Sequence, residues 1–275
     1  MTYKLIACDL DGTLLNDKSE VSAENLNAIK KITEKGVIFA IVTGRTLKEI
    51  PLELINCADI RYIIFSDGAA VLDKKSEEVI FTAYMNSDEI ESIFGLLSSF
   101  DTMAEIFNDG TPFAEYSQLS SESLDYFEID KSYRGVVEST RKGIKNMKNH
   151  LADFSKAEIF NVFFKNADER DLCIEKLNKI DGINVTTSMD NNLEIMSRSA
   201  SKGNSLKKLC GEAGINMSEV IAAGDSKNDI TMFRAAGLAL SPANAAEEAK
   251  KNAEAVICSN NEHIAQYIYK HYFED

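Results

Sequence analysis

Short apolar runs that each end in a polar or glycine-containing turn constrain the fold of this 275-residue chain most strongly. Three of them stand near the N-terminus, with segments of helical spacing between them: runs at 5–8, 37–42 and 62–65, and helices predicted at 22–34 and 46–56. Strands that are apolar along their whole length and alternate with helices are typical of a parallel sheet covered on both faces. The same alternation returns from Leu193 to Tyr272, so the two ends of the chain are predicted to form one α/β layer.

The middle of the chain mixes predicted strands and helices without the regular alternation of the two ends, and this pattern predicts an inserted domain. Two strand-like segments are joined through Asp109-Gly110, a pair that favours tight hairpin turns, and helices are predicted around them, one at Thr140–Leu151. We therefore predict an α/β chain with a Rossmann-like, doubly wound parallel-sheet core at 1–81 and 191–275. An inserted α+β cap domain is predicted at 82–190.

Composition excludes several classes of partner. The formal net charge of -14 argues against nucleic acid or anionic lipid, because both need a basic face. No apolar stretch approaches the roughly 20 residues that span a bilayer, and no secretory signal is visible, so we expect no membrane contact and a cytoplasmic location. The five cysteines lack C-x-x-C spacing and are interpreted as reduced thiols. A small molecule is the expected partner of a monomer or small homo-oligomer.

Asp9 and Asp11 follow the first apolar run, and Gly12 then lets the chain turn. In an extended strand, side chains two residues apart share a face, so both carboxylates are predicted to point the same way. Neighbouring anions repel, which indicates a bound cation or a shared proton. The pair is equally compatible with ordinary turn residues. A helix-loop-helix calcium site is excluded, because Leu14 stands where that loop needs glycine.

Three further motifs are predicted at the same edge, since ligands collect at the carboxyl ends of strands in an open parallel sheet. They are Thr43-Gly44-Arg45, the helix start at Lys202-Gly203, and the run Gly224-Asp225-Ser226-Lys227-Asn228-Asp229. Each has a purely structural interpretation: a strand-to-helix turn, a solvated lysine behind a capping serine, and turn or cap residues. A hydroxyl, a small residue and helix N-terminal amides at Thr43-Gly44 can also hold a phosphate.

Together the motifs are more specific than any one of them. Four unpaired carboxylates at one edge, from Asp9, Asp11, Asp225 and Asp229, would be strongly disfavoured without a cation. Oxygen ligands beside a phosphate site indicate Mg²⁺, and no histidine cluster or cysteine pair indicates zinc or copper. With Mg²⁺ bound, one aspartate can attack phosphorus while another donates a proton.

In order and spacing, these motifs resemble those of the haloacid dehalogenase superfamily, specifically the Cof-type phosphatases with a large α/β cap inserted between the second and third motifs. Asp9-Leu10-Asp11-Gly12-Thr13-Leu14-Leu15 resembles the first motif, and Thr43-Gly44-Arg45 the second. Ser201-Lys202-Gly203 is similar to the third, and Gly224 to Asp229 to the fourth. The resemblance runs from end to end of the chain.

The resemblance implies a role for each matched position. Asp9 would be the nucleophile that forms an aspartyl-phosphate, and Asp11 would protonate the leaving alcohol and then activate water. Phosphate-binding residues would be Thr43, Gly44, Lys202 and Asn228, the last orienting Lys202 or the phosphate. The metal site, for Mg²⁺, would comprise Asp9, Asp11, Asp225 and Asp229.

Two loops depart from the family pattern. Ser66-Asp67-Gly68-Ala69 stands where the group usually has Asn-Gly-Ala, so Asp67 brings a further carboxylate to the rim of the site. Its charge would lower the affinity for highly charged substrates, or its backbone would simply keep the turn. Ser241-Pro242 departs from the family pattern in the loop before Asn244, so the resemblance does not predict the path of that loop.

The function predicted from this resemblance is Mg²⁺-dependent hydrolysis of small phosphorylated metabolites: sugar phosphates, phosphorylated cofactors or nucleotides. Two alternatives remain at this point. A sugar-phosphate phosphotransferase or phosphomutase would pass the phosphoryl group to a sugar instead of water. A noncatalytic metabolite-binding protein would use the fold without turnover.

Overall fold

The computed structural model describes residues 3–187, 189 and 191–274. The chain forms two compact units, the first from Met1–Gly44, Ile50–Thr82 and Ser201–Asp275, and the second from Arg45–Glu49 and Ala83–Ala200. The chain thus passes between the units four times, and the short segment after Gly44 belongs to the second unit.

An eight-stranded sheet forms the centre of the first unit, in the order β14-β13-β12-β1-β2-β3-β4-β5. Its strands are β1 (Leu5–Cys8), β2 (Ile38–Val42), β3 (Ile60–Phe65), β4 (Ala70–Asp73), β5 (Glu78–Thr82), β12 (Val220–Ala223), β13 (Leu238–Pro242) and β14 (Ala255–Ile257). All pairs from β14 to β3 are parallel, and β4 and β5 add an antiparallel edge. The predicted α/β class with a parallel core is confirmed.

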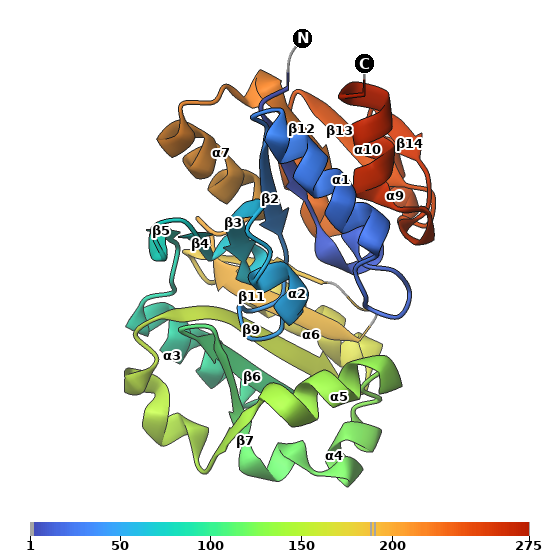
Figure 1. The fold of residues 1–275 in the computed structure, drawn as a ribbon. Helices are drawn as coiled ribbons and strands as arrows, with labels where there is room; N and C mark the ends of the chain where they lie inside the picture. The colour runs from blue at the N-terminus through green and yellow to red at the C-terminus, as the bar shows by residue number, and fades with distance from the viewer. Residues whose placement is uncertain (1–2, 188, 190, 275) are drawn as a thin grey trace. The chain divides into compact units, whose positions relative to one another are not determined.

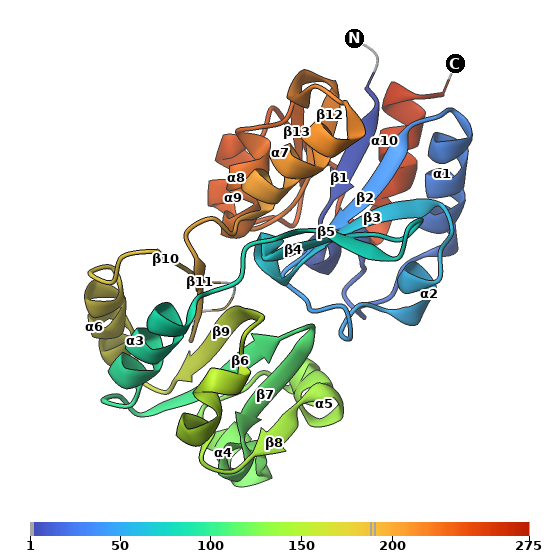
Figure 2. The same cartoon turned by 90° about the vertical axis from the view of Figure 1, so that its left-hand side faces the viewer.

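Helices cover both faces of this sheet, with α7, α8 and α9 on one side and α1 and α10 on the other (Figures 1 and 2). Their bounds are α1 (Ala23–Glu34), α2 (Leu52–Ile55), α7 (Lys202–Ala213), α8 (Ile230–Phe233), α9 (Glu247–Asn252) and α10 (Ile264–Tyr272). Leu206 and Leu209 of α7 are fully buried in a core cluster with Ala7, Val42 and Ile64 of the central strands. This double cover explains why the central strands are apolar on both faces.

The second unit is a mixed six-stranded sheet in the order β10-β11-β9-β6-β7-β8, with helices packed on it. Its strands are β6 (Thr102–Asn108), β7 (Thr111–Glu115), β8 (Lys142–Ile144), β9 (Ala157–Phe164), β10 (Ile183–Thr186) and β11 (Asn192–Ser197), and its helices α3 (Ser87–Leu97), α4 (Ser121–Tyr126), α5 (Lys131–Thr140) and α6 (Ala167–Leu177). Side chains of α3 and α6 share one core cluster with β6, β9 and β11. The predicted α+β cap is confirmed as a separate mixed sheet.

The Asp109-Gly110 hairpin forms as predicted, with φ of 52° and 69° at the two turn residues between β6 and β7. The strand predicted at Leu193–Met196 also forms, but it belongs to the cap sheet. As part of β11, it pairs antiparallel with β9 and β10 rather than with the parallel sheet.

Two predicted helices are wrong. The segment from Thr46 turns instead, with the Glu49 carboxylate accepting the Thr46 amide, and α2 begins only after Pro51, since a residue before proline avoids the helical region. Thr140–Leu151 contains β8 and a 3₁₀ turn, because Lys142–Ile144 finds a parallel partner in β7. The helix of this region, α5, lies just before it.

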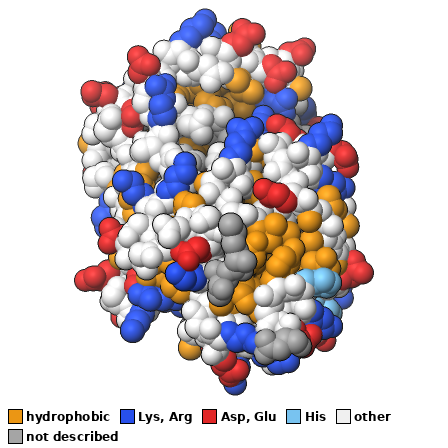
Figure 3. All heavy atoms as spheres, turned by 90° about the horizontal axis from the view of Figure 1, so that it is seen from above, with side chains coloured by type: hydrophobic (Ala, Val, Ile, Leu, Met, Phe, Trp, Pro, Cys, Tyr) orange, Lys and Arg blue, Asp and Glu red, His pale blue; other side chains and the backbone are white. Residues whose placement is uncertain are grey.

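Short 3₁₀ helices lie at Ser66–Gly68, Tyr116–Leu119, Met147–Asp153, Met217–Glu219, Lys227–Asp229 and Asn260–Glu262. No helix in the described part of the chain is both long and apolar enough to cross a membrane. On the face that Figure 3 displays, basic and acidic side chains are interspersed and form no basic patch. The five cysteines are free, as predicted.

Candidate active site

Asp9 lies directly after β1, at the carboxyl end of the parallel sheet, and the residue is 4% exposed. The strand ends at Cys8, so Asp9 and Asp11 follow it and do not lie on it as predicted; both keep extended backbone angles, and the chain makes a tight turn within Leu10–Leu14. Gly12 has φ of +71°, and a Cβ there would meet the Asp225 carboxylate at 2.4 Å. The tight turn therefore brings the first motif against the fourth.

Lys202 is the first residue of α7, and its side chain is buried between two carboxylates. Its Nζ donates to Oδ1 of Asp9 and to Oδ1 of Asp229, each at 2.7 Å. Burial alone would lower the pKa of Lys202, but the carboxylates of Asp229 and Asp9 outweigh it and raise that pKa. Ser201 caps the helix by accepting the Asn204 amide, which fixes where α7 begins.

Asp229 organises the loop after β12. Its Oδ2 accepts the backbone amides of Asp225 and Ser226, both at 2.9 Å, while its Oδ1 is held by Lys202. Gly224 makes this possible, because a Cβ there would lie 2.4 Å from Cγ of Asp229. Both carboxylate oxygens of Asp229 are thus bound by groups of the protein itself.

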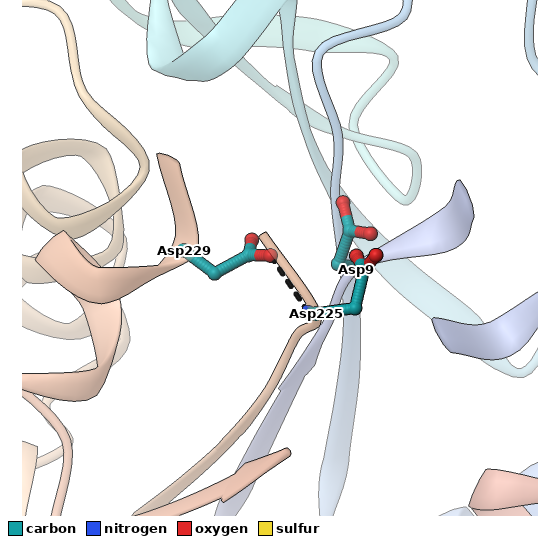
Figure 4. Close-up of side chains that lie close together, drawn as sticks. All are labelled: Asp9, Asp225 and Asp229. Atoms are coloured by element: carbon teal, nitrogen blue, oxygen red, sulfur yellow. Dashed lines mark hydrogen bonds between the residues drawn. The ribbon is translucent and has the colours of Figure 1, made fainter. Parts of the chain in front are cut away.

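Asp9, Asp225 and Asp229 form a carboxylate cluster whose ligand atoms lie within 4.8 Å of one another and could hold a metal ion. Figure 4 shows Asp9 and Asp225 side by side, with Asp229 turned toward the backbone of Asp225. Burial, reinforced by the neighbouring carboxylates, raises the pKa of Asp9 well above its usual range and that of Asp225 to about 7. A cation at this point would relieve the repulsion.

The other predicted site residues lie around this cluster, in the first unit. Asp11 is exposed, and its charge raises the pKa of Asp225. Thr43 is buried directly after β2, and its amide donates to Ile64 of β3 at 2.9 Å. Gly44 follows it, but no helix N-terminus does, since the chain turns from Thr46 to Pro51. Any phosphate bound there would meet single amides rather than a helix end.

Asn228 does not bond to Lys202. Its Nδ2 donates to Oδ1 of Asp67 at 2.9 Å, and its Oδ1 accepts the Ser226 hydroxyl at 2.6 Å. Asp67 is itself 2% exposed, so the departure noted in the sequence lies inside the site rather than at its rim. The roles assigned to these residues in catalysis, phosphate binding and metal binding remain predictions.

Sequence reasoning did not assign three residues that support this geometry. Thr13 places its hydroxyl 3.5 Å from Oδ1 of Asp225, and the Ser226 hydroxyl also reaches Asp229 at 3.2 Å. Asn244 donates to the carbonyl of Gly12 at 2.8 Å and so braces the first motif. Thr13 and Ser226 stand inside the motifs, but only the folded loops show which hydroxyl faces a carboxylate.

Comparison with known proteins places this geometry in a family. A family model described as haloacid dehalogenase-like hydrolase matches residues 6–268. The chain is 30% identical to phosphatase YwpJ of Bacillus subtilis, over 98% of this chain and 99% of that protein. It is 31% identical to the 5-amino-6-(5-phospho-D-ribitylamino)uracil phosphatase YwtE of the same organism, over 96% of each.

Solved structures agree with the fold. A haloacid dehalogenase-like hydrolase from B. subtilis superposes with a TM-score of 0.85 at 28% identity, covering 98% of this chain and 99% of that one. The subclass IIB sugar phosphatase BT4131 has a TM-score of 0.81 at 18% identity, covering 98% of each chain, and supports the fold alone. The chain therefore belongs to the haloacid dehalogenase-like hydrolases, and the predicted enzyme class, a phosphatase of this type, is confirmed.

Proposed function

We propose that the chain is a Mg²⁺-dependent phosphatase that hydrolyses small phosphorylated metabolites through an aspartyl-phosphate on Asp9. One observation carries this proposal: the buried Asp9 carboxylate is held at one oxygen by Lys202 and lies beside the Asp225 carboxylate. A carboxylate fixed in this way is positioned to attack, and its neighbours supply the charge balance that a phosphoryl group needs.

The residues present fit a magnesium ion. Mg²⁺ prefers one or two carboxylates together with water and substrate phosphate oxygens. Asp9 and Asp225 would hold it, because both oxygens of Asp229 are already bound by Lys202 and the loop amides. Asp229 would then act through Lys202 and the loop. When bound, Mg²⁺ neutralises charge on the transferring phosphoryl group.

The chain's own residues carry the remaining steps. An Asp9 oxygen forms a bond to phosphorus as the ester P–O bond breaks, and Asp11, exposed beside the cluster, gives its proton to the departing alcohol. Asp11 then takes a proton from water, which attacks phosphorus, breaks the Asp9–phosphorus bond and releases inorganic phosphate. Thr43, Gly44 and Lys202 would hold the phosphoryl oxygens during both steps.

The first test replaces the nucleophile. Asp9→Asn should reduce phosphate release by a factor on the order of 10³ or more while preserving the fold, because shape is kept and the attacking oxygen is lost. Asp168→Asn, at an exposed position of α6, is the matched control and should hydrolyse at the wild-type rate. Substantial turnover by Asp9→Asn, with unchanged circular dichroism, would contradict the nucleophile assignment.

The substrate is sought by a screen of phosphorylated metabolites with Mg²⁺ present. Two relatives named as 5-amino-6-(5-phospho-D-ribitylamino)uracil phosphatases support a panel that begins with that compound and continues with the predicted sugar phosphates, phosphorylated cofactors and nucleotides. Free phosphate from a panel member supports hydrolysis. An isomerised hexose phosphate without free phosphate would favour a phosphomutase instead, and binding without any turnover would favour a noncatalytic protein.

A further inference from the structure

Asp67 is a buried carboxylate in the first unit that the steps above do not use. It follows β3 in the 3₁₀ turn Ser66–Gly68, with φ of +50°, and its amide donates to the Thr43 carbonyl at 3.1 Å. This bond ties the turn to the predicted phosphate loop. Because the residue is only 2% exposed, the charge of its carboxylate is poorly screened by water.

The carboxylate of Asp67 faces Gly44. A Cβ on Gly44 would lie 3.2 Å from Oδ1 and 3.5 Å from Oδ2 of Asp67. Oδ1 accepts from Asn228, whereas Oδ2 is buried and has no hydrogen-bond partner within the described chain. A buried carboxylate oxygen without a partner is costly, so its presence needs an explanation.

Neither the backbone nor the hydrogen bond to Asn228 explains the charge. Asparagine adopts the left-handed region as readily as aspartate, and its side-chain oxygen would accept the same bond from Asn228. What only aspartate supplies at position 67 is a negative charge beside Gly44. Lys202, the cation of the site, lies within the field of this charge, which contributes to raising its pKa.

We propose that Asp67 is a specificity-determining residue that limits the affinity of the phosphoryl site for phosphate. Its carboxylate opposes the phosphoryl oxygens that Thr43 and Gly44 would bind, so inorganic phosphate is held weakly and leaves readily. The inference rests on the proposed function, because it takes this loop as the phosphate site. It assigns Asp67 an effect on binding rather than a chemical step.

Asp67→Asn isolates the charge, since it keeps the shape, the backbone preference and the acceptor for Asn228. Removing one buried negative charge beside the bound phosphate should lower the dissociation constant of inorganic phosphate on the order of tenfold. The constant is measured by isothermal titration with Mg²⁺ present, and as competitive inhibition of p-nitrophenyl phosphate hydrolysis. KM should fall with it, and kcat should change less.

Two further variants separate charge from positioning. Asp67→Gly keeps the positive φ but removes both the carboxylate and its bond to Asn228, and should also tighten phosphate binding. Asn228→Ala removes that bond and keeps the charge, so it should not tighten binding. If Asp67 acted only by holding Asn228, Asp67→Asn would match the wild type and both other variants would bind phosphate more weakly.

Unchanged or weaker phosphate binding by Asp67→Asn overturns the inference; Asp67→Gly decides it in the same way if the asparagine variant does not fold. The titration needs no turnover. Failure of the wild type to hydrolyse any ester would therefore refute the proposed function while leaving the phosphate measurement to decide the role of Asp67.

Discussion

The single lysine of the site shows how closely its charges are balanced. Lys202 is 2% exposed, and such burial is tolerated only because the carboxylates of Asp9 and Asp229 accept hydrogen bonds from its ammonium group. Removing Lys202 would leave two buried carboxylates without their cation, whereas removing one carboxylate would leave Lys202 paired with the other. The same bonds align Lys202 with the proposed nucleophile, so stability and function depend on the same contacts.

Protons and a cation should compete for the Asp9–Asp225 pair. Burial raises the pKa of Asp225 from 3.8 to about 7, so the metal-free folded protein binds a proton that the unfolded chain has released in that range. The stability of the metal-free protein therefore falls as pH rises from the unfolded-state pKa of 3.8, and it is lowest above the folded-state pKa of about 7. Under the proposed function, Mg²⁺ would replace this proton.

We therefore expect Mg²⁺ to raise the Tm more at about pH 8 than at about pH 6. Thermal unfolding with and without Mg²⁺, after treatment with a chelator, measures this difference. Asp225→Asn should lose most of the gain at both pH values, because a ligand is missing. A gain in Tm that does not depend on pH would show that these carboxylates are not the site at which the ion binds.

At the scale of elements, helix α7 is held against the neighbouring segment by a glycine. A Cβ on Gly203 would lie 2.2 Å from the Thr231 carbonyl oxygen of α8, whereas a Cβ on Gly211, in the same helix, meets nothing within 4 Å. Both glycines lie in α7, but only Gly203 is in close contact with another element. The close approach at Gly203 lies next to Lys202, so it sets the position of that side chain.

Gly203→Ala should lower the free energy of unfolding by about 1–3 kcal/mol, because the backbone of α7 must move away from α8. It should also reduce kcat, since Lys202 moves with the helix. Gly211→Ala should raise stability by up to about 1 kcal/mol, because alanine has the higher helix propensity. Urea unfolding and phosphate release measure both. Equal effects of the two substitutions would contradict the packing argument.

At the scale of the whole molecule, a buried arginine joins three distant segments of the second unit. Arg141, after α5, makes two bonds of 2.9 Å to the Glu105 carboxylate of β6 and a further ion pair with Glu49. Its Nη2 also donates to the Tyr133 hydroxyl at 2.5 Å. The arginine side chain is fully buried, and Glu49 lies in the short segment that follows the predicted phosphate loop.

Arg141→Met should lower the free energy of unfolding by about 3–5 kcal/mol, because two buried carboxylates lose their cation. Arg198→Met is the matched control: it removes the same charge from an exposed pair with Asp181, and little change is expected. Denaturant unfolding of the full chain compares them. A loss as small as that of the control would mean that the Arg141 pairs contribute no net stability.

Much of the fold follows from local sequence. Apolar runs fixed the central strands within a residue or two, Ser201 fixed the start of α7, and Asp109-Gly110 fixed a hairpin, because each depends on residues close in the chain. The antiparallel strands β4 and β5 at the edge of the sheet were not predicted, since their pairing depends on partners and not on periodicity.

The sequence by itself determined which side chains gather at the carboxyl edge of the sheet, because strand order and polarity bring Asp9, Thr43 and Asp225 to one end. The tertiary structure decided what each of them touches. Asp229 is occupied by Lys202 and loop amides, and Asn228 faces Asp67. Hydrogen-bond partners and burial are set by loops that meet only after folding, which a motif read along the chain does not specify.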